Sequence, residues 1–180
     1  MYDQALKVSD TAVLLKDTPK EYYYRGVIYR KLNNDIMAKK ELEKSISKDK
    51  KYPAPRLELA DLLIPTDTEE AMKQCNAVIE NYSRNTDAYM MRSKVYKSIL
   101  DYPAAIDDIS KNILIDPLNP SFYLVRGLYY QEFNQHTNAI NDFSKYISMR
   151  ENDPDAYFAR AKSYEEIMNF EKAMADFTKI

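Results

Sequence analysis

The side chains that could do chemistry are few, and they do not gather in the sequence. His136 is the only histidine, and no set of cysteines, histidines or carboxylates with metal-ligand spacing surrounds it. Cys75 is the only cysteine, so it can form no internal disulfide and leaves the redox compartment open. No glycine-rich phosphate loop, nucleophile elbow or zinc spacing occurs. We therefore predict no catalytic, cofactor-binding or metal-binding residue, and a chain that is not an enzyme.

Charged residues recur in a pattern that is open to two interpretations. The arginines are Arg25, Arg92, Arg126 and Arg160, and the recurring acids are Glu41, Asp108, Asp142 and Asp176. The favoured interpretation is a structural ladder of partly buried ion pairs. The alternative is a column of arginines that binds a ligand.

Bulk composition excludes several classes of protein. With 180 residues, 45% of them hydrophobic and 30% charged, the chain can bury a core and is unlike a disordered segment. Its formal net charge of -2 provides no broad positive field for nucleic acid or an anionic membrane surface. No apolar run is long enough to cross a membrane, and residues 1–4 lack the profile of a secretory signal. We expect no nucleic-acid partner and no membrane insertion by this segment.

A fixed period organises the sequence. Pro120 and Pro154 lie 34 residues apart, and counting back gives Thr86, Pro53 and Pro19, with one residue missing near Pro65. The predicted repeats are residues 19–52, 53–85 (33 residues, irregular), 86–119, 120–153 and 154–180, the last one truncated. Residues 1–18 are predicted to be the second helix of a preceding partial repeat. Together they would form a single repeat domain.

Equivalent positions of the repeats share their residue types. The eighth position is always small, and so is a later position that always holds alanine. The small residues are Gly26, Ala60, Ser93, Gly127 and Ala161, then Ala38, Ala71, Ala105, Ala139 and Ala173. Helical spacing of tyrosines and isoleucines around them predicts two amphipathic helices per repeat, which cross closely at the small residues. Cys75 takes a position that is otherwise apolar, so it is predicted to be core, and His136 is predicted to pack in a turn.

Proline and capping residues predict where the helices begin. Thr18, Asn119 and Asp153 each precede a proline, and Asn34, Asp67 or Thr68, Asp101 and Asn169 precede the second helices. The predicted helices cover residues 2–16, 20–32, 36–49, 54–64, 68–82, 87–99, 103–115, 121–133, 137–150, 155–167 and 171–180. No stretch alternates as a strand would, so sheet is not expected.

These residues carry a family resemblance. The repeat with Tyr123, Gly127, Tyr130, Ala139 and Phe143 resembles the tetratricopeptide repeat. The resemblance covers residues 19–180 and is weakest in the second repeat, where Arg56 replaces an aromatic residue. It implies an all-α fold, a right-handed superhelical solenoid of antiparallel helix pairs. We expect a fragment of a longer array without polar end caps, which could self-associate through its ends.

In this family the first helices line a concave groove that binds a peptide or helix of another protein. The fifth position of the repeats is an apolar column of Tyr23, Leu57, Met90, Leu124 and Phe158, which is either groove or mainly core. The residues expected to bind the partner are Tyr23, Tyr24, Val27, Arg30, Met90, Met91, Lys94, Lys97, Leu124, Leu128, Phe158 and Lys162. The cations would lie at the groove edge.

The same resemblance argues against one kind of partner. Members that grip the C-terminal carboxylates of chaperones carry lysine, asparagine and arginine at set positions of three successive repeats. Here those positions hold Tyr23, Val27, Glu58, Asp87 and Met91, so a chaperone clamp is not expected. The leading function is a non-enzymatic protein-binding scaffold or adaptor. The alternatives are a targeting or regulatory segment of a larger enzyme, part of a cell-envelope or secretion assembly, and a helical-repeat RNA binder.

Overall fold

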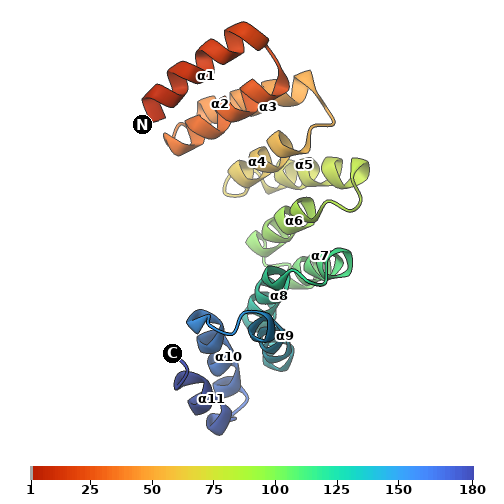
Figure 1. Cartoon of the computed structure of the whole chain (residues 1–180). Coiled ribbons are helices and arrows are strands. Elements are labelled where there is room, and N and C mark those ends of the chain that lie inside the picture. The colour runs from red at the N-terminus through yellow and green to blue at the C-terminus, as the bar shows by residue number, and fades with distance from the viewer. Residues whose placement is uncertain (1) are drawn as a thin grey trace. The chain divides into compact units, whose positions relative to one another are not determined.

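The computed structural model describes residues 2–180, with side chains from residue 7 onward, and these residues form helices joined by short turns (Figure 1). The helices are α1 (Tyr2–Lys16), α2 (Pro19–Lys31), α3 (Asp35–Lys48), α4 (Pro53–Leu63), α5 (Thr68–Asn81), α6 (Thr86–Ser98), α7 (Tyr102–Ile115), α8 (Pro120–Glu132), α9 (His136–Met149), α10 (Pro154–Glu166) and α11 (Phe170–Phe177). No strand occurs in this part of the chain, as the sequence predicted. The helices divide into two compact units, Met1–Ser98 and Ile99–Ile180, which we call the N-terminal and the C-terminal unit.

Each helix within a unit packs against the next one along the chain. In the N-terminal unit the first helices of successive repeats also meet, since α2 contacts α4 and α4 contacts α6. In the C-terminal unit α8 contacts α10 in the same way. A face built from first helices is therefore continuous within each unit.

Side-chain caps fix the starts of most second helices. Asn34, Asp67, Asp101 and Asn169 each accept a hydrogen bond from the backbone N–H three residues later. Only α9 differs among the second helices whose caps are described, since its N-cap Gln135 makes no such bond. The sequence predicted three of these capping residues and gave Asp67 or Thr68 for the fourth, and the four helices start within one residue of their predicted positions.

First helices begin at their prolines. Pro19, Pro53, Pro120 and Pro154 are the first residues of α2, α4, α8 and α10, so the predicted ranges began one residue late. Thr18 does not cap α2 as predicted, because its hydroxyl donates to the Glu21 carboxylate instead of accepting a backbone N–H. At the other end of the chain α11 stops at Phe177, three residues before the predicted end at 180.

Small residues allow the helices to cross closely. The ten small positions predicted from the repeats are all buried in the structure. A Cβ added to Gly26 would come within 2.9 Å of Leu42 Cγ, and one added to Gly127 within 2.7 Å of Phe143 Cε1. The alanine of the partner helix is near in the first repeat, where Ala38 O would lie 3.3 Å from the added Cβ. At Gly127 the nearest atoms all belong to the Phe143 ring, because the missing side chain leaves room for a whole ring.

Candidate functional site

In the first, fourth and fifth repeats the recurring arginine binds the recurring acid of its own repeat. Arg126 donates from Nε to Asp142 Oδ2 at 2.7 Å and from Nη2 to Oδ1 at 2.8 Å, and Arg160 binds Asp176 by the same two-pronged geometry. Arg25 donates twice to one oxygen of Glu41, at 2.9 and 2.6 Å. The hydrogen bonds with Asp142 raise the pKa of Arg126 above its ordinary value against the effect of burial. These guanidinium groups are permanently charged and held in place.

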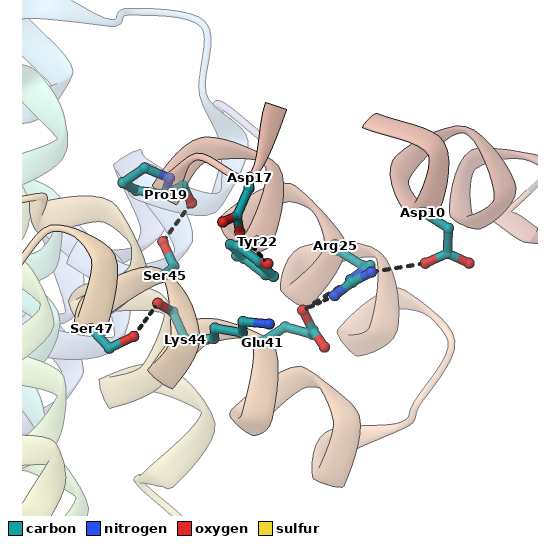
Figure 2. A network of polar contacts seen from close by, with 9 residues as sticks. All are labelled: Asp10, Asp17, Pro19, Tyr22, Arg25, Glu41, Lys44, Ser45 and Ser47. Atoms are coloured by element: carbon teal, nitrogen blue, oxygen red, sulfur yellow. Dashed lines mark hydrogen bonds and ion pairs between the residues drawn. The ribbon is translucent and has the colours of Figure 1, made fainter. Parts of the chain in front are cut away.

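The remaining arginine nitrogen reaches the preceding repeat. Arg126 Nη1 donates to Ser110 Oγ at 3.0 Å, and Arg160 Nη1 donates to Ser144 Oγ at the same distance. Arg25 reaches Asp10 on α1 at 3.1 Å in addition to Glu41, as Figure 2 shows. Arg92 likewise donates to Asn76 Oδ1, 16 residues earlier, at 2.7 Å. Each arginine therefore ties a first helix to the second helix of the preceding repeat.

Tyrosine rings complete the surroundings of these arginines. The Arg160 guanidinium lies 5.5 Å from the ring centre of Tyr157 and 6.0 Å from that of Tyr164. Arg92 lies at 5.5 Å from Tyr89 and 5.9 Å from Tyr96. Ring faces and carboxylates thus surround the planar groups. The geometry supports the structural ladder over a ligand-binding arginine column.

The second repeat departs from this pattern in a consistent way. Leu59 stands where the other repeats have arginine, and it is buried. The acid position correspondingly holds neutral Gln74, which accepts a hydrogen bond from Arg56 Nη1 at 2.6 Å. Loss of the recurring arginine is thus accompanied by loss of the recurring acid, so no buried carboxylate is left without its arginine at this crossing.

In the N-terminal unit the predicted partner-binding residues form a mixed surface. Tyr23 and Met91 are half-buried and pack against the core around Leu42 and Val95, whereas Tyr24 is 58% exposed. The Tyr23 ring lies 5.3 Å from the Tyr24 ring. Burial, together with the carboxylate of Glu58, raises the pKa of Tyr23, so its hydroxyl remains a hydrogen-bond donor. Val27 and Met90 are half-buried as well, which leaves Tyr24 as the most accessible aromatic side chain of the set.

The C-terminal unit carries the second part of the predicted set. Leu124 is half-buried against the core around Tyr123 and Ala156. Leu128 is exposed, and Phe158 is 50% exposed, with its ring 6.1 Å from that of Phe177. The fifth-position column is therefore neither all groove nor all core, because its members range from core-packed to half-exposed.

Known proteins share this architecture. Residues 120–153 match the family model described as tetratricopeptide repeat. The C-terminal part of a repeat-containing protein from Cytophaga hutchinsonii aligns with a TM-score of 0.82 at 22% identity, over 99% of this chain and 72% of that one. MamA from Desulfovibrio magneticus aligns with a TM-score of 0.78 at 17% identity, over 89% of this chain and 92% of that one. The chain has the tetratricopeptide-repeat fold. A further structure titled MamA gives a TM-score of 0.77 at 21% identity, over 91% of this chain and 90% of that one. The search of curated proteins found no match to the sequence.

Cations predicted at the edge of the groove are largely bound within the tetratricopeptide array. Arg30 donates to Glu58 Oε1 at 2.5 Å and to Asp61 Oδ2 at 2.9 Å, and Lys94 lies 3.7 Å from Asp61. These groups belong to α2, α4 and α6, so the ion pairs bridge three neighbouring first helices. In the C-terminal unit Lys162 binds Glu165 at 2.8 Å. A partner would have to displace these internal pairs to bind the cations directly.

Three residues of this surface were not identified from the sequence. Tyr52, in the turn before α4, has its ring centre 5.7 Å from that of Tyr23. Glu58 and Asp61 bind Arg30 across the repeat boundary. Their spacing of three on one helix is the signal that could have revealed the acidic pair. Tyr52 gave no signal, because the contact depends on how the turn folds back.

The other residues with chemical potential lie apart from this surface. Cys75 is fully buried in the core of the N-terminal unit, as predicted for a small hydrophobic residue. His136 is the first residue of α9. Among the described side chains no three histidines, cysteines or carboxylates are grouped to hold a metal ion. The described helices also include none with the length and apolar character needed to span a membrane.

Proposed function

We propose that this chain is a non-enzymatic protein-binding module that holds a peptide or helix of another protein against its first helices. The observation that carries the proposal is the exposed Tyr24 ring on α2, which lies beside Tyr23 on a face shared by α2, α4 and α6. Large aromatic groups that are half exposed and backed by packed neighbours are common anchors of protein interfaces. An extended or helical partner could contact successive first helices along this face.

The polar groups beside the tyrosines support the same proposal. Arg30, Glu58, Asp61 and Lys94 already bind one another, so they would act as a polar rim around the aromatic anchor. The Tyr23 hydroxyl remains protonated and can donate to a carbonyl of the partner. In the C-terminal unit, Phe158 and Leu128 offer a comparable apolar contact.

The test is a cross-linking experiment with a matched tyrosine control. A photoreactive phenylalanine analogue replaces Tyr24 in one variant and Tyr82 in another, since both tyrosines are exposed and lie in the same unit. Illumination in cells that produce the protein naturally should cross-link a partner at position 24 and not at position 82. The same partner should be lost when the purified Tyr24→Ala variant is used as bait, and retained with Tyr82→Ala.

Affinity measurements would then separate groove from core. Tyr24→Ala and Phe158→Ala should each weaken binding of the captured partner by about 1–2 kcal/mol, while the thermal melts stay close to that of the parent. Met90→Ala and Leu124→Ala should weaken binding by a similar amount. Leu124→Ala should also lower stability, because Leu124 packs against the core. If all four variants bound the partner with the affinity of the parent, the proposal would be contradicted.

A further inference from the structure

The turns inside the repeats of the C-terminal unit expose apolar side chains. We call the set the turn surface; its members are Ile99, Leu100, Phe133, Ile167, Met168 and Phe170. Leu100 and Met168 are the most exposed, at 71% and 79%. Such residues face water at a turn where a polar residue would serve, so their presence calls for a partner that covers them.

The backbone makes the choice of Leu100 and Met168 more unusual. Both occupy the left-handed region, with φ of 61° and 58°. Asn33 and Asn134 hold the equivalent positions of two other repeats, with φ of 55° and 58°. Asparagine tolerates this conformation better than leucine or methionine, whose side chains clash with the backbone there. Two repeats therefore keep apolar side chains at a steric cost that their sister repeats avoid.

Contacts within the unit bring the three turns together. The Tyr102 ring, which follows Leu100, stacks on Phe133 with ring centres 5.9 Å apart. Tyr102 also donates its hydroxyl to Glu132 Oε2 at 2.9 Å. Gln131 then joins the end of α8 to α10, because its Nε2 donates to Ala159 O and to Ser163 Oγ at 3.1 Å each. The first two turns are thus in direct contact, and α8 is tied to α10, the helix that leads into the third turn.

The charge around the turn surface is negative. α8 ends at Glu132 and α10 at Glu165 and Glu166, and neither helix has a basic residue in its last turn. The C-terminal end of a helix already carries partial negative charge, so acids there add to an unfavourable potential. The first turn is an exception, because α6, which leads into Ile99 and Leu100, has Lys97 in its last turn. Lys172 also follows Phe170 on α11. The acids beside the three turns, Asp101, Glu132, Glu165, Glu166 and Glu171, outnumber the lysines Lys97, Lys162 and Lys172. Of the nearby lysines, Lys162 is bound to Glu165.

We propose that the turn surface binds a positively charged amphipathic helix of a partner protein. Apolar side chains of that helix would cover Leu100, Phe133 and Met168, and its lysines or arginines would meet Glu132, Glu166 and the helix ends. The negative potential disfavours an anionic membrane as the occupant. The turn surface shares no residue with the apolar part of the first-helix face, so binding at one need not use the side chains of the other.

The experiment measures binding of two fluorescent peptides to the full chain. One is an amphipathic helix of leucine and lysine, and the other has glutamate in place of every lysine. The lysine peptide should bind and the glutamate peptide should not. Leu100→Asn combined with Met168→Asn should weaken the lysine peptide about tenfold. Leu114→Asn combined with Leu118→Asn is the matched control, because these leucines are similarly exposed but do not belong to the turn surface: Leu114 lies on α7, and Leu118 lies in the turn between two repeats.

Further readouts keep the result interpretable. The Leu100→Asn/Met168→Asn variant should melt no lower than the parent, since asparagine suits both turns, so weaker binding could not be ascribed to unfolding. Tyr24→Ala should leave the affinity for the lysine peptide unchanged, which separates this surface from the first-helix face. Equal binding of both peptides, or an equal loss in the control variant, would overturn the proposal. So would self-association of the parent that the double substitution abolishes, because the occupant would then be a second copy.

Discussion

Gly127 shows how a single missing side chain sets a helix crossing. A Cβ added to it would approach Cε1 of the Phe143 ring to 2.7 Å and Cδ1 to 2.9 Å. Phe143 is fully buried, so it has no free direction in which to move. Glycine is costly in a helix, but here the packing of a complete aromatic ring compensates for that cost.

Gly127→Leu should therefore be severely destabilising. The added side chain must displace a buried ring in a tightly packed crossing, and we expect a loss of about 2–4 kcal/mol in the free energy of unfolding. Denaturant melts measure the change. Asn141→Leu, at an exposed position of α9, is the control and should change stability by less than about 0.5 kcal/mol. A loss under about 1 kcal/mol for Gly127→Leu would show that the crossing can relax.

Met168 offers a prediction of the opposite sign. Its φ of 58° places a long side chain in the left-handed region, and 79% of the residue is exposed. Met168→Asn should raise the free energy of unfolding by about 0.5–1 kcal/mol, because it relieves strain without removing a core contact. Asn134→Met is the reciprocal change at the equivalent turn and should lower stability by a similar amount. A destabilised Met168→Asn variant would mean that Met168 contributes contacts that outweigh its strain.

At the scale of helices, the arginine and the acid act as one unit in the first, fourth and fifth repeats. Arg126 and Asp142 lie on α8 and α9, and the same arginine reaches Ser110 on α7. Three helices thus share one guanidinium group. The second repeat shows the alternative solution, with Leu59 and Gln74 at the two positions. The chain itself therefore indicates which pairs of residues are compatible at this crossing.

A double-mutant cycle tests this compatibility. Arg126→Leu alone leaves the carboxylate of Asp142 buried without its partner, and should cost about 3 kcal/mol. Adding Asp142→Gln reproduces the pair of the second repeat and should recover at least about 1 kcal/mol of that loss. Urea melts of the two single variants and the double variant give the coupling free energy. Strict additivity would mean that the two side chains do not depend on each other.

The sequence predicted the helices well because their determinants are local or periodic. Asn34, Asp67 and Asp101 cap the helices that follow them, and the small residues recur at a fixed interval. The binding surface was less predictable, because exposure depends on neighbouring repeats. Arg30 and Lys94 were predicted to lie at the groove edge and to meet a partner. In the structure, Glu58 and Asp61 of the irregular second repeat bind them instead. The spacing of Glu58 and Asp61 could reveal that the two acids share a helix face, but not which cations of the neighbouring repeats bind them.

At the scale of the whole molecule, contacts remain local along the chain. Within each unit a helix packs mainly against the next helix and, for first helices, against the first helix of the following repeat. Such an array has no central core that every element shares. Stability is then close to a sum of repeats and their interfaces, so damage in one unit should be felt most strongly by its own helices.

Hydrogen exchange of the Gly127→Leu variant tests this independence. The substitution lies in the C-terminal unit, where the clash with Phe143 weakens the crossing of α8 and α9. Amides of α8, α9 and α10 should exchange at least about tenfold faster than in the parent, since a loss of 1.4 kcal/mol raises the open population by that factor. Amides of α2, α3 and α4 should keep their protection, because those helices pack only within the N-terminal unit.

Gly26→Leu supplies the mirror experiment in the N-terminal unit. A Cβ at this position would meet Leu42, and the effect of the substitution should be confined to that unit. Uniform loss of protection along the chain in either variant would mean that the two units unfold as one cooperative body.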